Sequence, residues 1–380
     1  MAGTALLTLG RLPKALDLAR ALAGAGWRVL VAEPGKRHLS GYSRSVHASF
    51  QVAAPVHEPE RYLDDLVSLI QREGVDLVVP VSEECLHTCQ LYGRVPDHVR
   101  IASLPPAELI PLHSKWDFVQ SCQRFGLAVP ETARLGSGEA ETLVQRLPVI
   151  VKREYSCAGV GLERVAKGEA LPEREEPAEW LVQEQIDGTE LCTFSVAHEG
   201  RVLGTVLYRG TVVSGTVAVC FERLVADARV TEFVERFVAG SGASGFVAFD
   251  LIQNSEGVVH GIECNPRATS GVHFIEAEDL ALALTDPASC HELRLRPHRL
   301  MQQFYPCLTE TQLAFGKWPR FRRYLGQLIR AKEVCFQWRD PLPFWLLPYA
   351  AWPILSMTLF QGKSFGEAAT WDIEWEPPAS

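Results

Sequence analysis

The first hundred residues alternate short apolar runs with segments of helical periodicity. Apolar runs cover residues 5–9, 28–33 and 77–80. Between the first two runs, apolar residues recur every three or four positions at residues 12–22, the spacing of a helix that buries one face. Residues 59–73 are also expected to form a helix. Strands separated by helices in this order build βαβ units, so the pattern predicts a parallel sheet.

Beyond this layer, extended segments follow one another more closely. A helix is expected at residues 115–125 and a strand at 149–153. Residues 181–186 and 191–197 are expected to pair as two strands across an Asp187-Gly188 turn. This succession predicts an antiparallel sheet with helices on one face, an α+β arrangement behind the parallel layer.

Three further elements belong to this second region. Two strands are expected at residues 202–208 and 217–221, and a helix at 230–239. Residues 210–216, between the two strands, are rich in glycine, serine and threonine. Such a segment could contact a substrate or a mobile loop.

The most informative stretch is a predicted hairpin whose strands cover residues 246–252 and 258–264. The sequence between them, Gln-Asn-Ser-Glu-Gly, favours a turn. Side chains alternate between the two faces of a strand. A register that pairs even positions of the first strand with odd positions of the second therefore places Asp250, Glu263 and Asn265 on one face.

Asp250, Glu263 and Asn265 would offer two carboxylates and an amide oxygen to a cation. Oxygen donors suit a hard ion such as Mg²⁺, which keeps some waters and shares its remaining positions with substrate phosphates. Arg267, just past Pro266, adds a fixed cation whose fork geometry suits a phosphate or an acyl phosphate. The alternative is a structural hairpin with polar residues on its solvated face.

A second signal follows the strand that ends near Lys152. Residues 154–161 form a loop of small side chains that includes Ser156, Gly159 and Gly161. Small side chains let backbone amides approach an anion closely, and a lysine beside them neutralises its charge. The segment therefore predicts a phosphate-binding loop, with an ordinary glycine-rich turn as the alternative.

Composition narrows the class of protein. The chain has 380 residues, of which 47% are hydrophobic and 22% charged, as in ordinary globular proteins of two or three domains. A net charge of -9 and the lack of a long basic stripe argue against nucleic-acid binding. The ten cysteines are scattered and no secretory signal is recognisable, so we expect reduced thiols and a cytoplasmic location.

Two other motifs are weaker. Cys85, His87 and Cys89 have a metal-ligand spacing, but no second pair completes a site. A helix that buries small thiols is therefore preferred over zinc. Residues 9–13 lack the three glycines of a dinucleotide fingerprint, and Glu33 after the second strand is a weak signal alone, so no dinucleotide cofactor is expected.

Glu83 has two interpretations. At the carboxyl edge of the parallel sheet it could face a ligand, since open α/β sheets bind ligands there. As a carboxylate in the first turn of a helix that runs to about Tyr92, it would instead interact with the helix dipole.

In their order, these features resemble the ATP-grasp superfamily, and most of all the branch with carbamoyl-phosphate synthase, biotin carboxylase and amino-acid ligases. The resemblance covers residues 6–269 and is strongest at 149–161, 182–190 and 245–267. It implies three regions: a Rossmann-like α/β domain at 1–110, a two-lobed α+β ATP-grasp domain at 111–285 with lobes at 111–181 and 182–285, and a small C-terminal extension of unclear role at 286–380.

The resemblance also implies roles for individual residues. Lys115 and Lys152 match the lysines that bind the nucleotide phosphates. The loop with Ser156, Gly159 and Gly161 matches the flexible phosphate lid, although Cys157 and Ala158 stand where glycines are frequent.

The hinge and the ribose site have counterparts as well. Residues 182–186, which include Glu184 and Ile186, match the hinge whose backbone meets adenine. Gln183 stands where an acidic residue is common. Glu190, in the pattern Gly188-Thr189-Glu190, matches the ribose-binding carboxylate.

The hairpin residues complete the set of site residues that the resemblance implies. Asp250, Glu263 and Asn265 match the magnesium ligands, and Arg267 matches the arginine that faces the transferred phosphoryl group. Arg267 and Lys152 are the expected catalytic residues. The expected cofactors are ATP and one or two Mg²⁺ ions, which Mn²⁺ could replace.

These features predict an ATP-dependent ligase. A carboxylate would attack the γ-phosphate to give an acyl phosphate and ADP, and an amine, or else a thiol, would displace phosphate. No Gly-x-Ser-x-Gly elbow or two-histidine metalloprotease motif competes with this interpretation. The alternatives are a non-catalytic nucleotide-binding regulatory protein and a bicarbonate-dependent carboxylase. The partners are small-molecule carboxylates and amines, with a homodimer left open.

The tail lies outside the resemblance. Residues 341–362 carry no charge and are long enough to cross a bilayer, but four prolines interrupt a continuous spanning helix, and membrane attachment is not expected. The basic residues upstream of this stretch are interpreted as solvated helix faces. Residues 371–375 alternate apolar and acidic side chains, which predicts a terminal strand.

Overall fold

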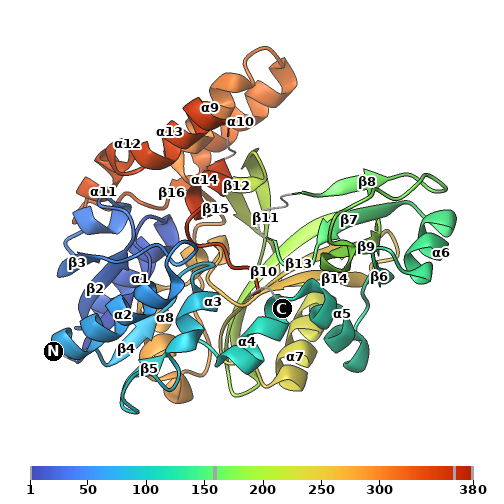
Figure 1. Cartoon of the computed structure of the whole chain (residues 1–380). Helices are drawn as coiled ribbons and strands as arrows, with labels where there is room; N and C mark the ends of the chain where they lie inside the picture. The colour runs from blue at the N-terminus through green and yellow to red at the C-terminus, as the bar shows by residue number, and fades with distance from the viewer. Residues whose placement is uncertain (1, 157–160, 363–364, 378–380) are drawn as a thin grey trace.

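The parallel sheet expected at the start of the chain is present in the computed structural model (Figure 1). The structure describes residues 2–156, 161–362 and 365–377. The first sheet has the order β3-β2-β1-β4-β5, and all its neighbouring strands are parallel. Its strands are β1 (Thr4–Leu7), β2 (Arg28–Glu33), β3 (Ala48–Gln51), β4 (Leu77–Val79) and β5 (Arg100–Ile101).

Helices α1 (Pro13–Gly24) and α2 (Pro59–Glu73) connect these strands, as the periodicity predicted. The helix expected after Ser82 is shorter than predicted, because it consists of α3 (Cys85–Thr88) and a 3-10 turn, η2 (Cys89–Leu91). Pro105 and Pro106 begin the next helix, α4 (Pro106–His113), since proline is tolerated in the first turn of a helix. Ser114 then caps α5 (Lys115–Arg124) by accepting a hydrogen bond from Asp117 N.

A second, four-stranded sheet follows in the order β6-β9-β7-β8. The helix α6 (Gly138–Arg146) contributes the buried residues Ala140, Leu143 and Val144 to the core of this unit. The strands are β6 (Thr132–Arg134), β7 (Val149–Arg153), β8 (Glu163–Val165) and β9 (Trp180–Glu184).

The third sheet has seven strands in the order β14-β13-β10-β11-β12-β15-β16. The two helices of this region are α7 (Ala228–Ser241) and α8 (Ala277–Thr285). Two of its strands, β15 and β16, come from beyond residue 285. The strands are β10 (Thr189–His198), β11 (Arg201–Ser214), β12 (Val217–Arg223), β13 (Gly245–Gln253), β14 (Val259–Asn265), β15 (Leu300–Gln302) and β16 (Lys332–Glu333).

The predicted pairing of residues 181–186 with 191–197 is wrong. Strand β9 pairs with β6 and β7, whereas β10 pairs with β11 and β13 in another sheet. The Asp187-Gly188 dipeptide therefore connects two sheets and does not turn a hairpin. A Cβ on Gly188 would lie 2.3 Å from the Gln253 carbonyl oxygen, so this glycine lets the connection pass close to β13.

The segment at 210–216, which is rich in glycine, serine and threonine, lies mostly within a strand. Strand β11 continues to Ser214, and the chain reverses at Gly215, whose φ is +59°. Pairing with β12 resumes through irregular register shifts near Val212. Cross-strand pairing therefore overrides the loop-like composition of this stretch.

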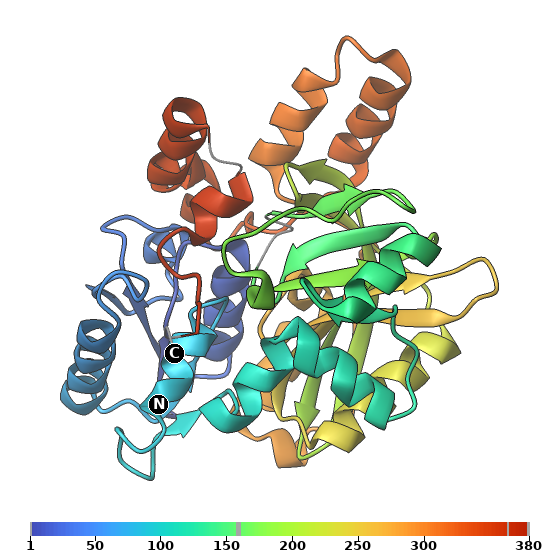
Figure 2. The same ribbon diagram turned by 45° about the vertical axis from the view of Figure 1, so that its right-hand side comes forward.

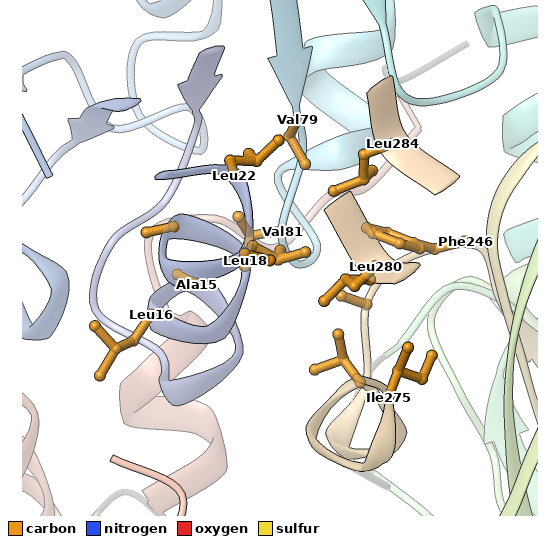
Figure 3. Packing of buried hydrophobic residues seen from close by; sticks show 14 of the residues in the cluster. Ala15, Leu16, Leu18, Leu22, Val79, Val81, Phe246, Ile275, Leu280 and Leu284 are labelled. Carbon is orange, nitrogen blue, oxygen red and sulfur yellow. The ribbon is translucent and has the colours of Figure 1, made fainter. Parts of the chain in front are cut away.

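One continuous hydrophobic core joins the parallel sheet to the seven-stranded sheet (Figure 3). Leu18 and Leu22 of α1 contribute to it from the N-terminal side, and Leu280 and Leu284 of α8 from the other side. Because burial of apolar surface is the main stabilising term in folding, these two layers are expected to stay together as one unit.

The C-terminal extension forms several helices at one end of the molecule, as both views show (Figures 1 and 2). None of the helices in the described part of the chain is long and apolar enough to cross a bilayer. The helices are α9 (Phe304–Leu313), α10 (Trp318–Arg330), α11 (Leu342–Trp345), α12 (Leu347–Ala350), α13 (Trp352–Gln361) and α14 (Phe365–Thr370).

The terminal strand predicted at residues 371–375 is wrong. This segment forms a turn and then an irregular stretch after α14. Its polar groups bind elsewhere: Asp372 pairs with Arg11 at 2.7 Å, and Glu374 Oε1 accepts a hydrogen bond from Thr370 Oγ1 at 3.0 Å. The alternation that suggested a strand instead reflects side chains that contact two different parts of the protein.

Asp340 anchors the extension to the parallel sheet region. Its carboxylate accepts hydrogen bonds from Arg20 Nε at 3.0 Å, Ser43 Oγ at 2.6 Å and the Arg44 amide at 3.0 Å. Arg20 also donates to the Cys335 carbonyl. Burial alone would raise the pKa of Asp340, but the Ser43 and Arg44 hydrogen bonds and the Arg20 charge hold it below the ordinary value of 3.8.

We therefore expect Asp340→Asn to loosen the extension. The substitution leaves the Arg20 guanidinium buried without its carboxylate, which should lower the free energy of local opening by about 3 to 5 kcal/mol. Hydrogen exchange of amides in residues 332–345 measures this opening. Because the folded pKa is depressed, the contribution of Asp340 is present above 3.8 and is lost as the pH falls below it, and the variant should lack this dependence.

Asp64→Asn is the matched control, since Asp64 is exposed on α2. Unchanged exchange in the Asp340→Asn variant would contradict the role of this anchor.

Candidate functional site

The hairpin of β13 and β14 places the three predicted cation ligands together. In its register Asp250 lies opposite Glu263, and Asn265 lies opposite Ala248. Directly opposed residues share a face, so the predicted common face is confirmed. The Asn265 amide nitrogen donates to Asp250 Oδ2 at 3.1 Å and lies 3.4 Å from Glu263 Oε1. The common face could be predicted from the sequence because the register of a hairpin depends on neighbouring residues.

The two carboxylates have opposite electrostatic surroundings. Burial and the neighbouring Glu263 raise the pKa of Asp250 well above its ordinary value. Burial would also raise the pKa of Glu263, but the ammonium groups of Lys115 and Lys152 hold it below its usual range. Two carboxylates this close repel each other, and a cation between them would relieve that repulsion.

This donor set fits a magnesium ion. It offers two carboxylates, which are hard ligands, while Asn265 Oδ1 accepts from Arg267 and would join the carboxylates only with its amide turned over. Within the described ranges, no group of three or more His, Cys, Asp or Glu side chains is arranged to hold a metal. An ion at this face would therefore need further oxygen ligands, from water or from a phosphate.

Strand β10 brings Glu190 to the same face of the sheet. Cys192 lies opposite Asp250, and Glu190 lies opposite Ile252 two residues along the ladder. Side chains two apart on a strand point the same way, so Glu190 shares the face of Asp250. Glu190 is exposed, whereas Asp250 is half-buried. Its carboxylate is therefore at the solvent-accessible edge of the site.

Lys115 reaches the site from the first turn of α5. Its ammonium group lies 3.5 Å from Glu263 Oε2 and donates to the Ser156 carbonyl at 2.8 Å and to Ser156 Oγ at 3.2 Å. The buried side chain therefore connects the metal-ligand face to the start of the predicted phosphate loop.

Lys152, at the end of β7, is also buried. Its ammonium group donates to Gln183 Oε1 at 2.7 Å. Burial and the nearby Lys115 lower the pKa of Lys152 to about 7, against the attraction of Glu263 and Asp250. Gln183 supplies a hydrogen bond without a charge, so Lys152 is not neutralised by an ion pair here, and an anion bound beside it would favour its protonated form. This is the consequence of Gln183 standing where an acidic residue is common.

The predicted phosphate loop is described only at its ends. Ser156 contacts Lys115, and Gly161 has a φ of +73°, which favours glycine. Gly159, together with Cys157 and Ala158, lies outside the described residues.

The hinge residues leave β9 beside the site. The Glu184 carboxylate accepts a hydrogen bond from the Glu131 amide at 3.1 Å, and Gln185 N donates to the Pro148 carbonyl at 3.0 Å. Ile186 follows as a half-buried residue before the close passage at Gly188. The side chain of Glu184 therefore fixes the end of β9, while its backbone continues into the connection between sheets.

Arg267 links the hairpin to the parallel sheet. Its guanidinium donates to Asn265 Oδ1 at 2.9 Å and lies 2.6 Å from Glu83 Oε1. Although burial raises the pKa of Glu83, the charge of Arg267 and the hydrogen bond from it lower this pKa overall. Glu83 and Glu84 both precede α3, so neither carboxylate lies in its first turn; Glu84 accepts instead from the amides of Val81 and Ser82. Glu83 is buried and pairs with Arg267, so it reaches the site through that arginine.

Two site neighbours were missed by sequence reasoning. Lys14, in α1, donates to Ser82 Oγ at 3.0 Å and to the Ala268 carbonyl at 2.6 Å. His113 Nε2 lies 3.8 Å from Glu83 Oε2, and burial lowers its pKa to about 4, so the ring is neutral near pH 7. A lone lysine or histidine on a helix carries no local signal, and only the tertiary fold brings these residues to the hairpin.

Two weaker sequence signals have structural explanations. Glu33 pairs with the Arg11 guanidinium and accepts from the Gly10 amide at 2.9 Å, so this carboxylate is already bound within its own loop. Cys85 and Cys89 are buried as expected, and Cys89 Sγ donates to the Leu86 carbonyl. His87 contacts the Glu374 carbonyl at 3.0 Å.

The sequence matches no known family model and no curated protein. Solved structures are similar in fold. Biotin carboxylase from Campylobacter jejuni has a TM-score of 0.60 at 15% identity, over 77% of this chain and 73% of that one. N5-carboxyaminoimidazole synthetase from Staphylococcus aureus has a TM-score of 0.63 at 12% identity, over 83% and 86%.

An L-amino acid ligase from Bacillus licheniformis has a TM-score of 0.56 at 15% identity, over 74% of each chain. All three proteins are ATP-grasp enzymes. The chain therefore has the ATP-grasp fold, and the resemblance inferred from its sequence is confirmed at the level of the fold.

Proposed function

We propose that the protein is an ATP-dependent ligase that joins a carboxylate to an amine, with an acyl phosphate as the intermediate. The observation that carries this proposal is the convergence of two carboxylates and an amide with three buried or half-buried cations, Lys115, Lys152 and Arg267. Phosphoryl transfer depends on positioning and charge neutralisation more than on a protein nucleophile, and this set of groups supplies both. The fold shared with ATP-grasp enzymes supports the same class of reaction.

The domain layout follows from this proposal. Residues 1–110 would form the Rossmann-like domain, residues 111–181 and 182–285 the two lobes that hold ATP, and residues 286–380 an extension. The nucleotide would lie between the four-stranded and seven-stranded sheets. Lys152 belongs to the first sheet and Asp250 to the second, and their opposite charges interact.

Each part of the nucleotide has a candidate partner. Lys115, Lys152 and the loop from Ser156 to Gly161 would hold the phosphates, since lysines and backbone amides both neutralise phosphate oxygens. The backbone from Glu184 to Ile186 would contact adenine, and Glu190 would accept from the ribose hydroxyls. These assignments follow the superfamily resemblance and fit the positions of the side chains on the described strands.

Asp250, Glu263 and Asn265 would hold magnesium, which supplies charge neutralisation between phosphate oxygens when it is bound. Arg267 would donate to the oxygens of the transferred phosphoryl group, held in place by Glu83 and Asn265. In the reaction, a substrate carboxylate oxygen bonds to the γ-phosphorus as the bond to ADP breaks. The amine then bonds to the carbonyl carbon, phosphate leaves with the electron pair of the broken bond, and the amine loses a proton.

A coupled assay for ADP release tests the proposal. Purified protein with Mg²⁺ and ATP is supplied with pooled carboxylates, including amino acids and bicarbonate, with and without pooled amines. We expect ADP release that requires both an acid and an amine. Release that requires bicarbonate would assign a carboxylase. ATP binding without turnover in any pool would contradict a ligase and indicate a regulatory protein.

The first variant tests the cation site. Glu263→Gln removes the carboxylate that faces Lys115, so ADP release should fall by about 10²- to 10³-fold, the cost of losing one electrostatic group at a phosphoryl site. The measurement is substrate-dependent ADP release as a function of Mg²⁺ concentration. Glu256→Gln is the matched control because Glu256 is exposed in the turn of the same hairpin. Equal activity of the two variants would reject the assignment.

The second variant tests Glu83 as a positioning residue. Glu83→Gln keeps the shape of the side chain but removes the charge that orients Arg267, so kcat should fall about a hundredfold while the KM for ATP changes little. Steady-state kinetics separate the two constants. Glu108→Gln, at an exposed position on α4, is the control. A proportional loss of ATP affinity would instead indicate that Glu83 only stabilises the fold.

A further inference from the structure

The C-terminal extension exposes large apolar side chains that its own core does not cover. Phe315 is 71% exposed at the tip between α9 and α10, and Ile329 is 74% exposed near the end of α10. Trp338, just after β16, is 88% exposed. Large exposed apolar side chains gathered in one region indicate an interaction surface. We refer to the exposed side chains of residues 313–361 as the C-terminal surface.

The surface of helix α10 has three sides: an exposed apolar stripe, a side packed against the protein and a side that carries arginines. At about 100° per residue, Trp318, Leu325 and Ile329 fall within about 40° of one another and form one exposed stripe. Tyr324 belongs to a different side, where the helix packs against α9 and the sheet. Arginines occupy the remaining circumference, beginning with Arg322 next to the exposed stripe.

The charge of this region is opposite to that of the whole chain. Residues 304–339 contain seven basic residues against two acidic ones, a net charge of +5 in a protein whose net charge is -9. Across the described part of the chain, Arg320, Arg322 and Arg323 form no ion pair with a carboxylate. Arg320 and Arg323 lie instead over the ring of Tyr324. Their charges therefore remain available to an external anion.

A second apolar group lies at the same end of the molecule. Residues 341–362 carry no charge, and their prolines begin three short helices, α11, α12 and α13. Trp345, Trp352 and Phe360 are 64%, 52% and 79% exposed. Both views place α10 and α13 at this end, away from the four-stranded sheet (Figures 1 and 2).

We propose that the C-terminal surface binds the interfacial region of an anionic lipid bilayer, as a peripheral and reversible attachment. Around the exposed side of α10, Arg322 adjoins the apolar stripe at about 40° from Trp318, and Arg323 and Arg320 follow at about 140° and 200°. A helix with an apolar stripe bordered by basic side chains suits the boundary between acyl chains and negatively charged headgroups. Tryptophan is also favoured at that boundary. This inference does not depend on the proposed ligase activity.

A second copy of the chain fits the same surface less well. In a two-fold contact through the apolar stripe, Arg322, which lies beside that stripe, would come close to Arg322 of the second copy. Like charges across an interface oppose association, whereas anionic headgroups neutralise all of them. The charge distribution therefore favours a lipid surface.

Vesicle sedimentation with the full-length protein tests the charged part of the proposal. The protein should sediment with phosphatidylcholine vesicles that contain phosphatidylserine, and binding should weaken as salt is raised. Arg320→Gln/Arg322→Gln/Arg323→Gln should lower the partition coefficient about a hundredfold at low salt. The control, Arg61→Gln/Arg94→Gln/Arg146→Gln, removes three exposed arginines elsewhere and should bind like the original protein.

A second pair of variants tests the apolar part. Trp318→Ser/Ile329→Ser should also lose vesicle binding, while Val225→Ser, at an exposed apolar position outside the extension, should retain it. Binding that is equal for neutral and anionic vesicles, or unchanged in the arginine variant, would overturn the proposal. So would the absence of vesicle binding together with a dimer in sedimentation velocity that Trp318→Ser/Ile329→Ser dissociates, which would assign the surface to a second copy.

Discussion

The repulsion between Asp250 and Glu263 is the constraint on which the rest of the site depends. The two carboxylates are held opposite each other by the ladder of one hairpin, so they cannot separate without breaking backbone hydrogen bonds. Lys115 and Lys152, from α5 and β7, lower the pKa of Glu263, whereas burial and Glu263 keep the pKa of Asp250 raised despite the charge of Arg267. The two carboxylates of the site therefore favour a bound cation, and the two lysines beside them favour a bound anion. A cation bound together with a polyphosphate satisfies both demands at once.

These charges also explain how separate elements become one site. Lys152 belongs to the four-stranded sheet, Glu263 to the seven-stranded sheet and Glu83 to the parallel layer. Arg267, which follows the last strand of the hairpin, connects the seven-stranded sheet to the parallel layer through its ion pair with Glu83. Isolated buried charges are costly, so each of these groups is stabilised only when the elements that carry the others are in place. Gln183 preserves this arrangement, because an amide orients Lys152 without neutralising it.

The sequence predicted those features that depend on local pattern. The common face of Asp250, Glu263 and Asn265 follows from strand alternation, and the parallel layer follows from helical and extended periodicity. The pairing of β9 with β10 failed because an Asp-Gly turn between two apolar runs looks the same whether it closes a hairpin or connects two sheets. Lys14 lies 254 positions from its acceptor Ala268, and no local pattern encodes such a contact.

The extension combines a firm anchor with an exposed end. Asp340 is fixed by Arg20, Ser43 and Arg44 immediately before the uncharged helices begin, so little free chain separates these helices from the parallel sheet. A flexible tether would let the catalytic lobes tumble at a surface, whereas an anchored attachment fixes their orientation. Because β15 and β16 of the same extension continue the seven-stranded sheet that carries Asp250 and Glu263, contact at the C-terminal surface would hold the cation site at a defined height above the headgroups.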